Sequence, residues 1–177
     1  MKEKQAALVE EFLGHVRPEY HELYRQLAVY ACNLGYRPVK TKTKDFCLDF
    51  RSAKAGRTLM KMEEKEQKHG SLRFGQRDNP GLRLRFFASL NYSALFHEGV
   101  RNVIEEFDGR YTGCYGCGHC KGEKQGYTYL YPDGRKVFRC GLELISVFDF
   151  TFDDLPEFQR LMQAQAEYDR AAQEQRA

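Results

Sequence analysis

The residues with the clearest capacity for chemistry are four cysteines in the second half of the chain. A glycine-rich segment carries a cysteine at every third position, namely Cys114, Cys117 and Cys120, and Cys140 follows between an arginine and a glycine. Three soft ligands on one short loop need a fourth ligand to complete a tetrahedron, and a hairpin between the loop and Cys140 would bring that ligand back. The spacing therefore predicts a four-thiolate metal site.

Two metal centres are compatible with this pattern. Structural zinc is tetrahedral and accepts four cysteines, whereas a 4Fe-4S cluster also uses a C-x-x-C-x-x-C run with a remote cysteine. Zinc is favoured because the loop is polar, with His119 and Lys121 among its residues, and because no proline follows Cys140. A zinc ion bound by four thiolates has no open position for water, so we expect a structural rather than a catalytic site.

Other interpretations of the cysteines are less specific. Cys117 and Cys120 form a C-x-x-C pair that can cycle as a redox dithiol, but the strand-to-helix junction that usually holds such a pair is missing. Ordinary reduced thiols are a further alternative, which the regular spacing disfavours. Cys32 and Cys47 lie in a predicted helix and a predicted strand, where we expect them to be small packing residues.

Signals of catalysis are weak in this sequence. The chain has no G-x-S-x-G, Walker A or H-E-x-x-H motif. Its histidines have no evident acidic partner, and we expect the run formed by Glu63, Glu64 and Glu66 to be exposed to solvent. We therefore expect a protein that is not an enzyme.

A second group of candidate site residues is basic. Apolar and basic residues alternate in two stretches, which predicts strands whose arginines share one face, opposite Leu72, Leu84 and Phe86. These arginines are Arg73, Arg83 and Arg85. Like charges on neighbouring strands repel one another, so such a cluster favours an anion: phosphate, a carboxylate or nucleic acid. The alternative is a solvated sheet face whose charges discourage edge association.

Three tyrosines at alternate positions of a later predicted strand form a candidate surface for stacking on nucleic-acid bases. They are Tyr127, Tyr129 and Tyr131. Packing of these rings against the metal loop or against a helix is the alternative. The net charge is only +3, far from the strongly basic balance of a dedicated nucleic-acid binder. We therefore do not expect a nucleic-acid partner, and a nucleic-acid-binding zinc module is the weaker alternative function.

Length and composition bound the remaining possibilities. The chain has 177 residues, of which 42% are apolar, and this is enough to build the core of a single domain. No apolar run reaches the length of a membrane helix, and the charged N-terminus lacks the apolar stretch of a signal peptide. Six cysteines without an export signal indicate a reducing compartment, so we expect a cytoplasmic protein whose partner is a small molecule or another protein.

Hydrophobic periodicity predicts an α+β fold, with an antiparallel β-meander, helices packed on one face, and a C-terminal metal-stapled hairpin and helix. A helical period runs through residues 6–16, 20–34, 91–107 and 154–170, and a period of two runs through residues 37–87. A hairpin is predicted over residues 127–147, with its turn at residues 132–134.

We expect these elements to form a single domain with three parts. They are a helix and sheet body (1–109), a cysteine loop with its hairpin (110–150) and a C-terminal helix (151–177).

Several segments together resemble a known family. Residues 114–122 read CYGCGHCKG, residues 131–134 read YPDG and residues 139–141 read RCG. With the segment 91–96, they are similar to a family of uncharacterised small bacterial proteins that carry a C-Y-G-C-G-x-C-K-G loop and a later R-C-G. This resemblance implies a shared fold and metal site and no particular reaction. The order of helix, meander and helix from about residue 19 to 107 also resembles YdhG-like α+β domains.

Overall fold

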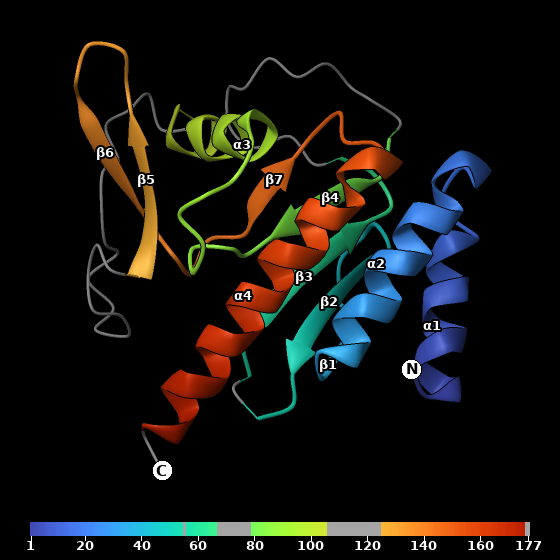
Figure 1. The fold of residues 1–177 in the computed structure, drawn as a ribbon. Coiled ribbons are helices and arrows are strands. Elements are labelled where there is room, and N and C mark those ends of the chain that lie inside the picture. Colours follow the sequence, from blue (N-terminus) through green and yellow to red (C-terminus); the bar gives the residue numbers. More distant parts are fainter. Residues whose placement is uncertain (55, 67–78, 106–124, 176–177) are drawn as a thin grey trace.

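The computed structural model describes residues 1–54, 56–66, 79–105 and 125–175 (Figure 1). Its helices are α1 (Glu3–Leu13), α2 (His21–Asn33), α3 (Ala94–Glu105) and α4 (Leu155–Glu174). Its strands are β1 (Tyr36–Lys40), β2 (Cys47–Ser52), β3 (Thr58–Glu63), β4 (Gly81–Leu84), β5 (Gly126–Leu130), β6 (Lys136–Cys140) and β7 (Ile145–Val147). Short 3-10 helices, Pro18–Tyr20 and Phe152–Asp154, precede α2 and α4. The predicted α+β class is confirmed.

Five strands form one antiparallel sheet in the order β1-β2-β3-β4-β7, and β5 and β6 form a separate antiparallel hairpin. The register pairs Phe50 with Met60 and Met60 with Leu84, so these side chains line up on one face of the sheet. Between Phe50 and Arg51 the register shifts, which leaves Leu59 of β3 as the extra residue of a β-bulge.

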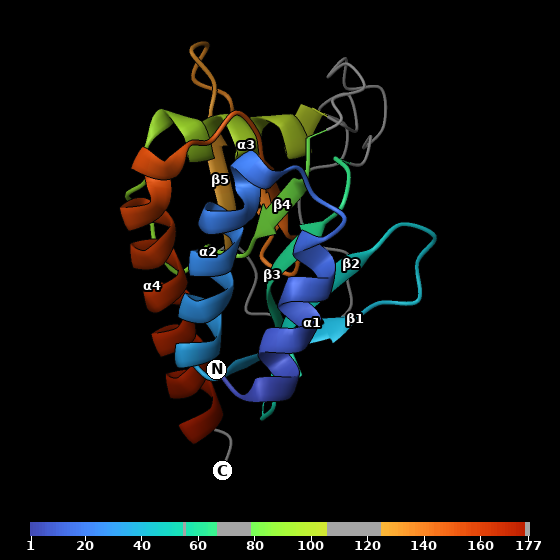
Figure 2. The same cartoon turned by 90° about the vertical axis from the view of Figure 1, so that its right-hand side faces the viewer.

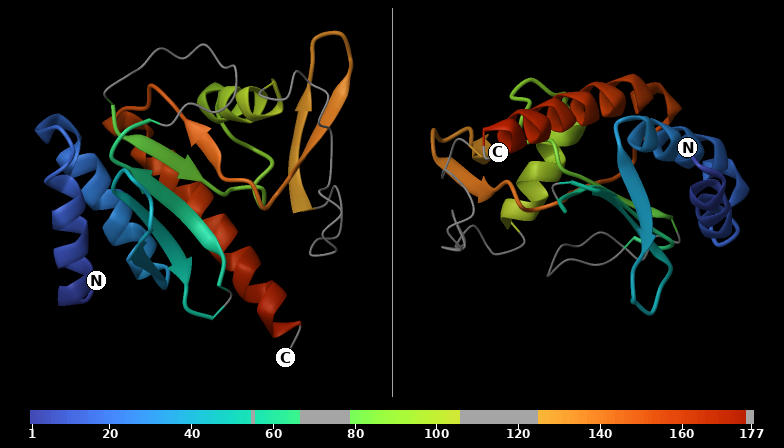
Figure 3. Two further views of the ribbon diagram at one scale, coloured as in Figure 1. Left: turned by 180° about the vertical axis from the view of Figure 1, so that it is seen from behind. Right: turned by 90° about the horizontal axis from the view of Figure 1, so that it is seen from below.

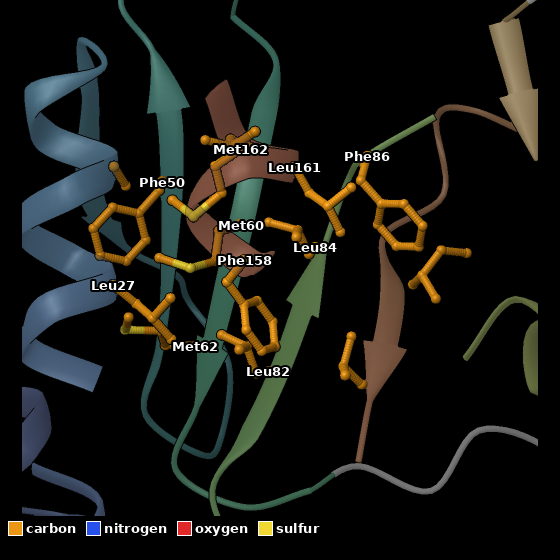
Figure 4. Close-up of a cluster of buried hydrophobic side chains, with 14 of the residues drawn as sticks. Leu27, Phe50, Met60, Met62, Leu82, Leu84, Phe86, Phe158, Leu161 and Met162 are labelled. Atoms are coloured by element: carbon orange, nitrogen blue, oxygen red, sulfur yellow. The ribbon is translucent and has the colours of Figure 1, made fainter. Parts of the chain in front are cut away.

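Helices α2 and α4 cover one face of this sheet, and α1 lies beside α2 at the β1 edge (Figures 1 and 2). The view from below shows both α2 and α4 on the same side of the strands (Figure 3). Leu27 of α2 and Leu161 of α4 meet the apolar row of the sheet in the core (Figure 4). At the far edge of the sheet, α3 packs against β7.

The predicted helices follow the expected apolar stripes. In α2, the buried residues Leu23, Leu27 and Ala31 recur at the helical spacing. The chain leaves this helix at Gly35, whose φ of 95° lies in the left-handed region that favours glycine. This sharp stop lets β1 begin at once and run back along the helix layer.

The prediction of one long second hairpin strand over residues 136–147 is wrong, because two strands occupy this range. β6 ends at Cys140, a turn follows, and β7 pairs with β4 in the five-stranded sheet. A Cβ atom at Gly141 would lie 2.3 Å from the carbonyl oxygen of Gln125, so only glycine fits where the chain leaves the hairpin. The expected part 110–150 therefore contributes one strand to the sheet of the body.

The predicted strand that contains Leu72 and Phe74 lies outside the described residues. In the part of the chain that the structure describes, no helix combines the length and the apolar character needed to cross a membrane.

Candidate functional site

The β5–β6 hairpin places Cys140 beside the end of the cysteine-rich segment. Cys140, the last residue of β6, pairs with Gly126, the first residue of β5, and the Gly141 N–H donates to the carbonyl of Gln125 at 3.0 Å. Cys120 precedes Gln125 by five residues in the sequence, a stretch that spans at most about 18 Å when extended. The predicted hairpin is therefore present and brings Cys140 beside Gly126, while the convergence of Cys140 with the other three cysteines stays a prediction.

Cys140 has tightly packed surroundings. Its side chain is fully buried. A Cβ atom at Gly126 would lie 2.4 Å from the carbonyl oxygen of Arg139, and one at Gly141 would lie 2.3 Å from that of Gln125. Both positions therefore require glycine for the backbones to approach this closely, and a substitution at either would move Cys140.

The other face of the hairpin attaches it to the rest of the protein. Because side chains alternate along a strand, Tyr127 and its partner Arg139 lie on the face opposite Cys140. The buried Tyr127 hydroxyl accepts the Phe86 N–H at 3.1 Å and donates to the Glu143 carbonyl at 3.3 Å. Burial raises the pKa of Tyr127 above its usual range, so the hydroxyl stays protonated. Arg139 forms an ion pair with Glu143 at 3.2 Å.

The other predicted metal ligands lie outside the described residues. They are Cys114, Cys117 and Cys120. Within the described part of the chain, no three His, Cys, Asp or Glu side chains converge as metal ligands. The remaining cysteines pack as predicted: Cys47 is fully buried in β2, and Cys32 packs against the core, where burial raises the pKa of its thiol.

Tyr127 and Tyr129 of β5, and Tyr131 directly after it, pack against the core of the protein. Tyr127 is 1% exposed and offers no face for stacking. The rings of Tyr129 and Tyr131 meet edge to face with 4.9 Å between their centroids. The Tyr131 hydroxyl donates to Glu105 of α3 at 3.5 Å, and the guanidinium of Arg135 lies 4.2 Å from the Tyr131 ring centroid. These contacts agree with the packing alternative.

The three arginines predicted to share one face lie in different surroundings. Arg73 lies outside the described residues. Arg83 of β4 pairs with Lys61 across the sheet, and its guanidinium lies 3.0 Å from the Glu63 carboxylate. Glu63 is 2% exposed, so the expectation of a fully solvent-exposed glutamate run is wrong at this position. The cause is that β3 extends to Glu63 and pairs it with Gly81 inside the sheet.

Arg85 lies on the helix-covered side of the sheet, which corrects the prediction of a common arginine face. Its N–H donates to the carbonyl of the bulged residue Leu59 at 2.8 Å. A bulge interrupts the alternation of side chains, and the Arg85 guanidinium reaches the Asp169 carboxylate of α4 at 2.5 Å. Arg85 is 2% exposed, so it is neither solvated nor grouped with Arg83.

Asp169 is the centre of a buried polar network that no sequence pattern predicted. Besides Arg85, its carboxylate accepts hydrogen bonds from the Tyr36 hydroxyl at 2.9 Å and from Gln165 at 3.2 Å. A guanidinium nitrogen of Arg57 lies 3.8 Å away. Burial, and then the charge of Asp169, raises the pKa of Tyr36 above its usual range, which keeps its hydroxyl a donor. The sequence carried one signal, since this acid falls on the apolar stripe of α4.

A pocket of about 540 Å³ opens next to this network. It lies between the end of α2, the start of β1, the turn after β2 and the C-terminal half of α4. The buried residues Tyr36 and Asp169 line the pocket, so the network forms part of its floor.

The chain matches no family model, no curated protein and no solved structure at a significant level. The family resemblance of the cysteine segment therefore stays a prediction.

Proposed function

We propose that this protein is a non-enzymatic binding module whose C-terminal hairpin is stapled by structural zinc. The ligands would be Cys114, Cys117, Cys120 and Cys140. The observation that supports this proposal is the position of Cys140, which pairs with Gly126 where the cysteine-rich segment enters β5. A hairpin that returns one cysteine to the end of a loop with three others gives four thiolates a short route to a common ion.

A closed zinc site would act on structure rather than on chemistry. Four thiolates fill the coordination shell, so no position is open for water or substrate. Zinc binding by cysteine requires deprotonated, reduced thiols, and we therefore infer a cytoplasmic location for the protein. Its partner would be a small molecule or another protein, and the pocket beside Asp169 is large enough for a small molecule.

The alternatives make different use of the same residues. An iron–sulfur or thiol-redox protein would use the four cysteines for electron transfer. A nucleic-acid-binding zinc module would need exposed aromatic rings, and burial of Tyr127 argues against this. The arginines do not form a common anion site in the described residues either, because Arg83 and Arg85 have separate acidic partners.

Metal analysis of protein purified without oxygen tests the proposal. We expect one zinc per chain, no iron and no visible absorption. Cys140→Ser should lower zinc affinity, and Cys32→Ser is the matched control because Cys32 lies in α2 and only packs against the core. A brown protein that contains iron would contradict the zinc assignment. Full zinc retention in the Cys140→Ser variant would remove Cys140 from the site.

A further inference from the structure

The pocket beside Asp169 has more positive than negative charge around it. Its floor contains the buried Asp169 carboxylate, which already accepts hydrogen bonds from Tyr36, Gln165 and Arg85. One carboxylate balances one of the two guanidinium groups next to it. Arg57 is the second, at 3.8 Å, beyond hydrogen-bonding distance, and its side chain makes no hydrogen bond within the described residues.

The rim of the pocket adds further cations. Arg37, Lys54 and Arg170 line it, and none of them lies within 4.0 Å of a carboxylate in the described part of the chain. Among the described residues, Glu174 is the one acidic side chain that lines the pocket besides Asp169. Counted over these residues, the pocket and the groups that contact its floor carry five basic side chains and two acidic ones.

Helix ends do not account for all of these cations. The C-terminal end of a helix attracts positive charge, and Arg170 donates to the Ala166 carbonyl of α4 at 3.3 Å. Lys54 and Arg57, however, come from the segment that joins β2 to β3, and their side chains donate no hydrogen bond to a helix carbonyl among the described residues. The donors of Lys54, which lines the pocket, therefore remain available to a ligand.

We infer that this pocket binds a small organic anion, with Lys54 and Arg170 holding its oxyanion group. A pocket with low-dielectric walls focuses the field of like charges and raises the local concentration of an oppositely charged ligand. Leu34, Ala53 and Ala166 also line the pocket, so its walls suit an apolar body next to the charged group. Carboxylates and phosphate esters share this chemistry. The inference rests on the binding-module part of the proposed function and not on the zinc part.

Calorimetric titration of the 177-residue chain at low ionic strength tests the inference. The probes are phenyl phosphate, benzoate, inorganic phosphate and benzylamine. We expect saturable binding of phenyl phosphate, benzoate or both, with Kd of about 1 mM or tighter. Whichever of the two binds better identifies the class of oxyanion. Inorganic phosphate should bind more weakly because it lacks an apolar body, and the benzylammonium cation should not bind. Raising the salt concentration to about 0.15 M should weaken anion binding, since exposed charges are then screened beyond about 8 Å.

Two exposed positions give matched variants. We expect Lys54→Gln and Arg170→Gln each to weaken binding about tenfold, as for the loss of one hydrogen bond to a charged group. Lys44→Gln, in the turn before β2, and Arg160→Gln, on α4, are the controls and should bind as the original chain does. All four changes are at exposed side chains, so the fold should be retained.

The inference is overturned if neither organic anion binds, if benzylammonium binds equally well, or if Lys54→Gln and Arg170→Gln bind as tightly as the controls. Zinc content measured on the same samples separates this result from the metal proposal. Loss of anion binding in protein with one zinc per chain would reject the ligand class alone, whereas intact anion binding in protein without zinc would reject the metal site alone.

Discussion

The body of the protein, meaning the five-stranded sheet with its helices, and the β5–β6 hairpin are stabilised in different ways. The sheet presents fully buried side chains such as Phe50, Met60 and Leu84 to the helices, and each contributes about 1.5–3 kcal/mol through burial. The hairpin has two strands, and Leu130 at the end of β5 is 67% exposed. A two-stranded hairpin is marginally stable alone. The hairpin therefore depends on its attachments, among them Tyr127, far more than the body depends on the hairpin.

Among the substitutions that test this difference, one in the core of the body should have the largest effect on the free energy of unfolding. Phe158 of α4 is fully buried between the rings of Phe96 and Phe150, whose centroids lie 4.9 and 5.3 Å away. We expect Phe158→Ala to lower the free energy of unfolding by about 3–5 kcal/mol, because it leaves a cavity in the core. Urea denaturation measures this loss. Phe152→Ala is the control, since Phe152 is 49% exposed, and its effect should be about 0.5 kcal/mol or less.

The next largest loss in the free energy of unfolding should come from breaking the buried ion pair between Arg85 and Asp169. Arg85→Met leaves a buried carboxylate without its guanidinium, and we expect a loss of about 3 kcal/mol in the free energy of unfolding. The double change Arg85→Met with Asp169→Leu should recover only part of this loss. It removes the unpaired buried charge, but the buried donors of Tyr36 and Gln165 then lose their acceptor. Both values come from urea denaturation.

The matched control for this pair is an exposed one. Arg25 of α2 contacts Glu10 of α1 at 2.8 Å, with about a third or more of each side chain exposed. Arg25→Met should cost about 0.5 kcal/mol, as for other solvent-exposed pairs. Equal losses for Arg85→Met and Arg25→Met would contradict the importance of burial at Asp169.

The fold was predictable where a periodic pattern decides it. The apolar stripe of α2 and the glycine that ends it, Gly35, are visible in the sequence, as is the turn of the β5–β6 hairpin. The departure of the chain at Gly141 was not predictable, because the reason is a contact with the Gln125 carbonyl. When two backbone segments that are separated in the sequence must approach closely, the only sign of this in the sequence is a glycine.

The candidate site was predictable in part for a similar reason. The spacing of the cysteines led to Cys140, and its position beside Gly126 agrees with that reasoning. The prediction put Arg85 on the wrong face of the sheet because it assumed that side chains keep alternating beyond the end of β4. There, the backbone N–H of Arg85 pairs with Leu59, the bulged residue of β3. Asp169 was missed because a single acid on an apolar stripe has meaning only once its partner Arg85, 84 residues away in the sequence, is known.

A smaller effect should come from the attachment of the hairpin to the body. The Tyr127 hydroxyl accepts the buried N–H of Phe86, and Tyr127→Phe leaves that donor without its partner. We expect a loss of about 1–2 kcal/mol in the free energy of unfolding. Tyr129→Phe is the matched control, because the Tyr129 hydroxyl makes no hydrogen bond within the described residues. If both variants behaved alike, the hairpin would not be tied to the body through Tyr127.

The smallest effect on the body should come from removal of the proposed zinc, although the effect on the hairpin should be large. Residues 111–126 contain few apolar side chains besides the cysteines, namely Tyr111 and Tyr115. Ordering such a segment costs about 1–2 kcal/mol per residue in conformational entropy. Structural zinc binds with an apparent free energy on the order of 10 kcal/mol, which offsets much of this cost. The hairpin should therefore lose order before the body does when the metal is removed.

Hydrogen exchange measures this difference region by region. We expect chelation, or Cys117→Ser, to lower protection in β5 and β6 while the amides of β2 and β3 change by about 0.5 kcal/mol or less. The reason is that the body keeps its own buried core, whereas the hairpin keeps only attachments such as Tyr127. Cys32→Ser under the same conditions is the control and should leave the hairpin protected. A loss of protection that spread equally through β2 and β3 would show that the metal stabilises the whole protein. Unchanged protection of the hairpin would remove the structural role proposed for the metal.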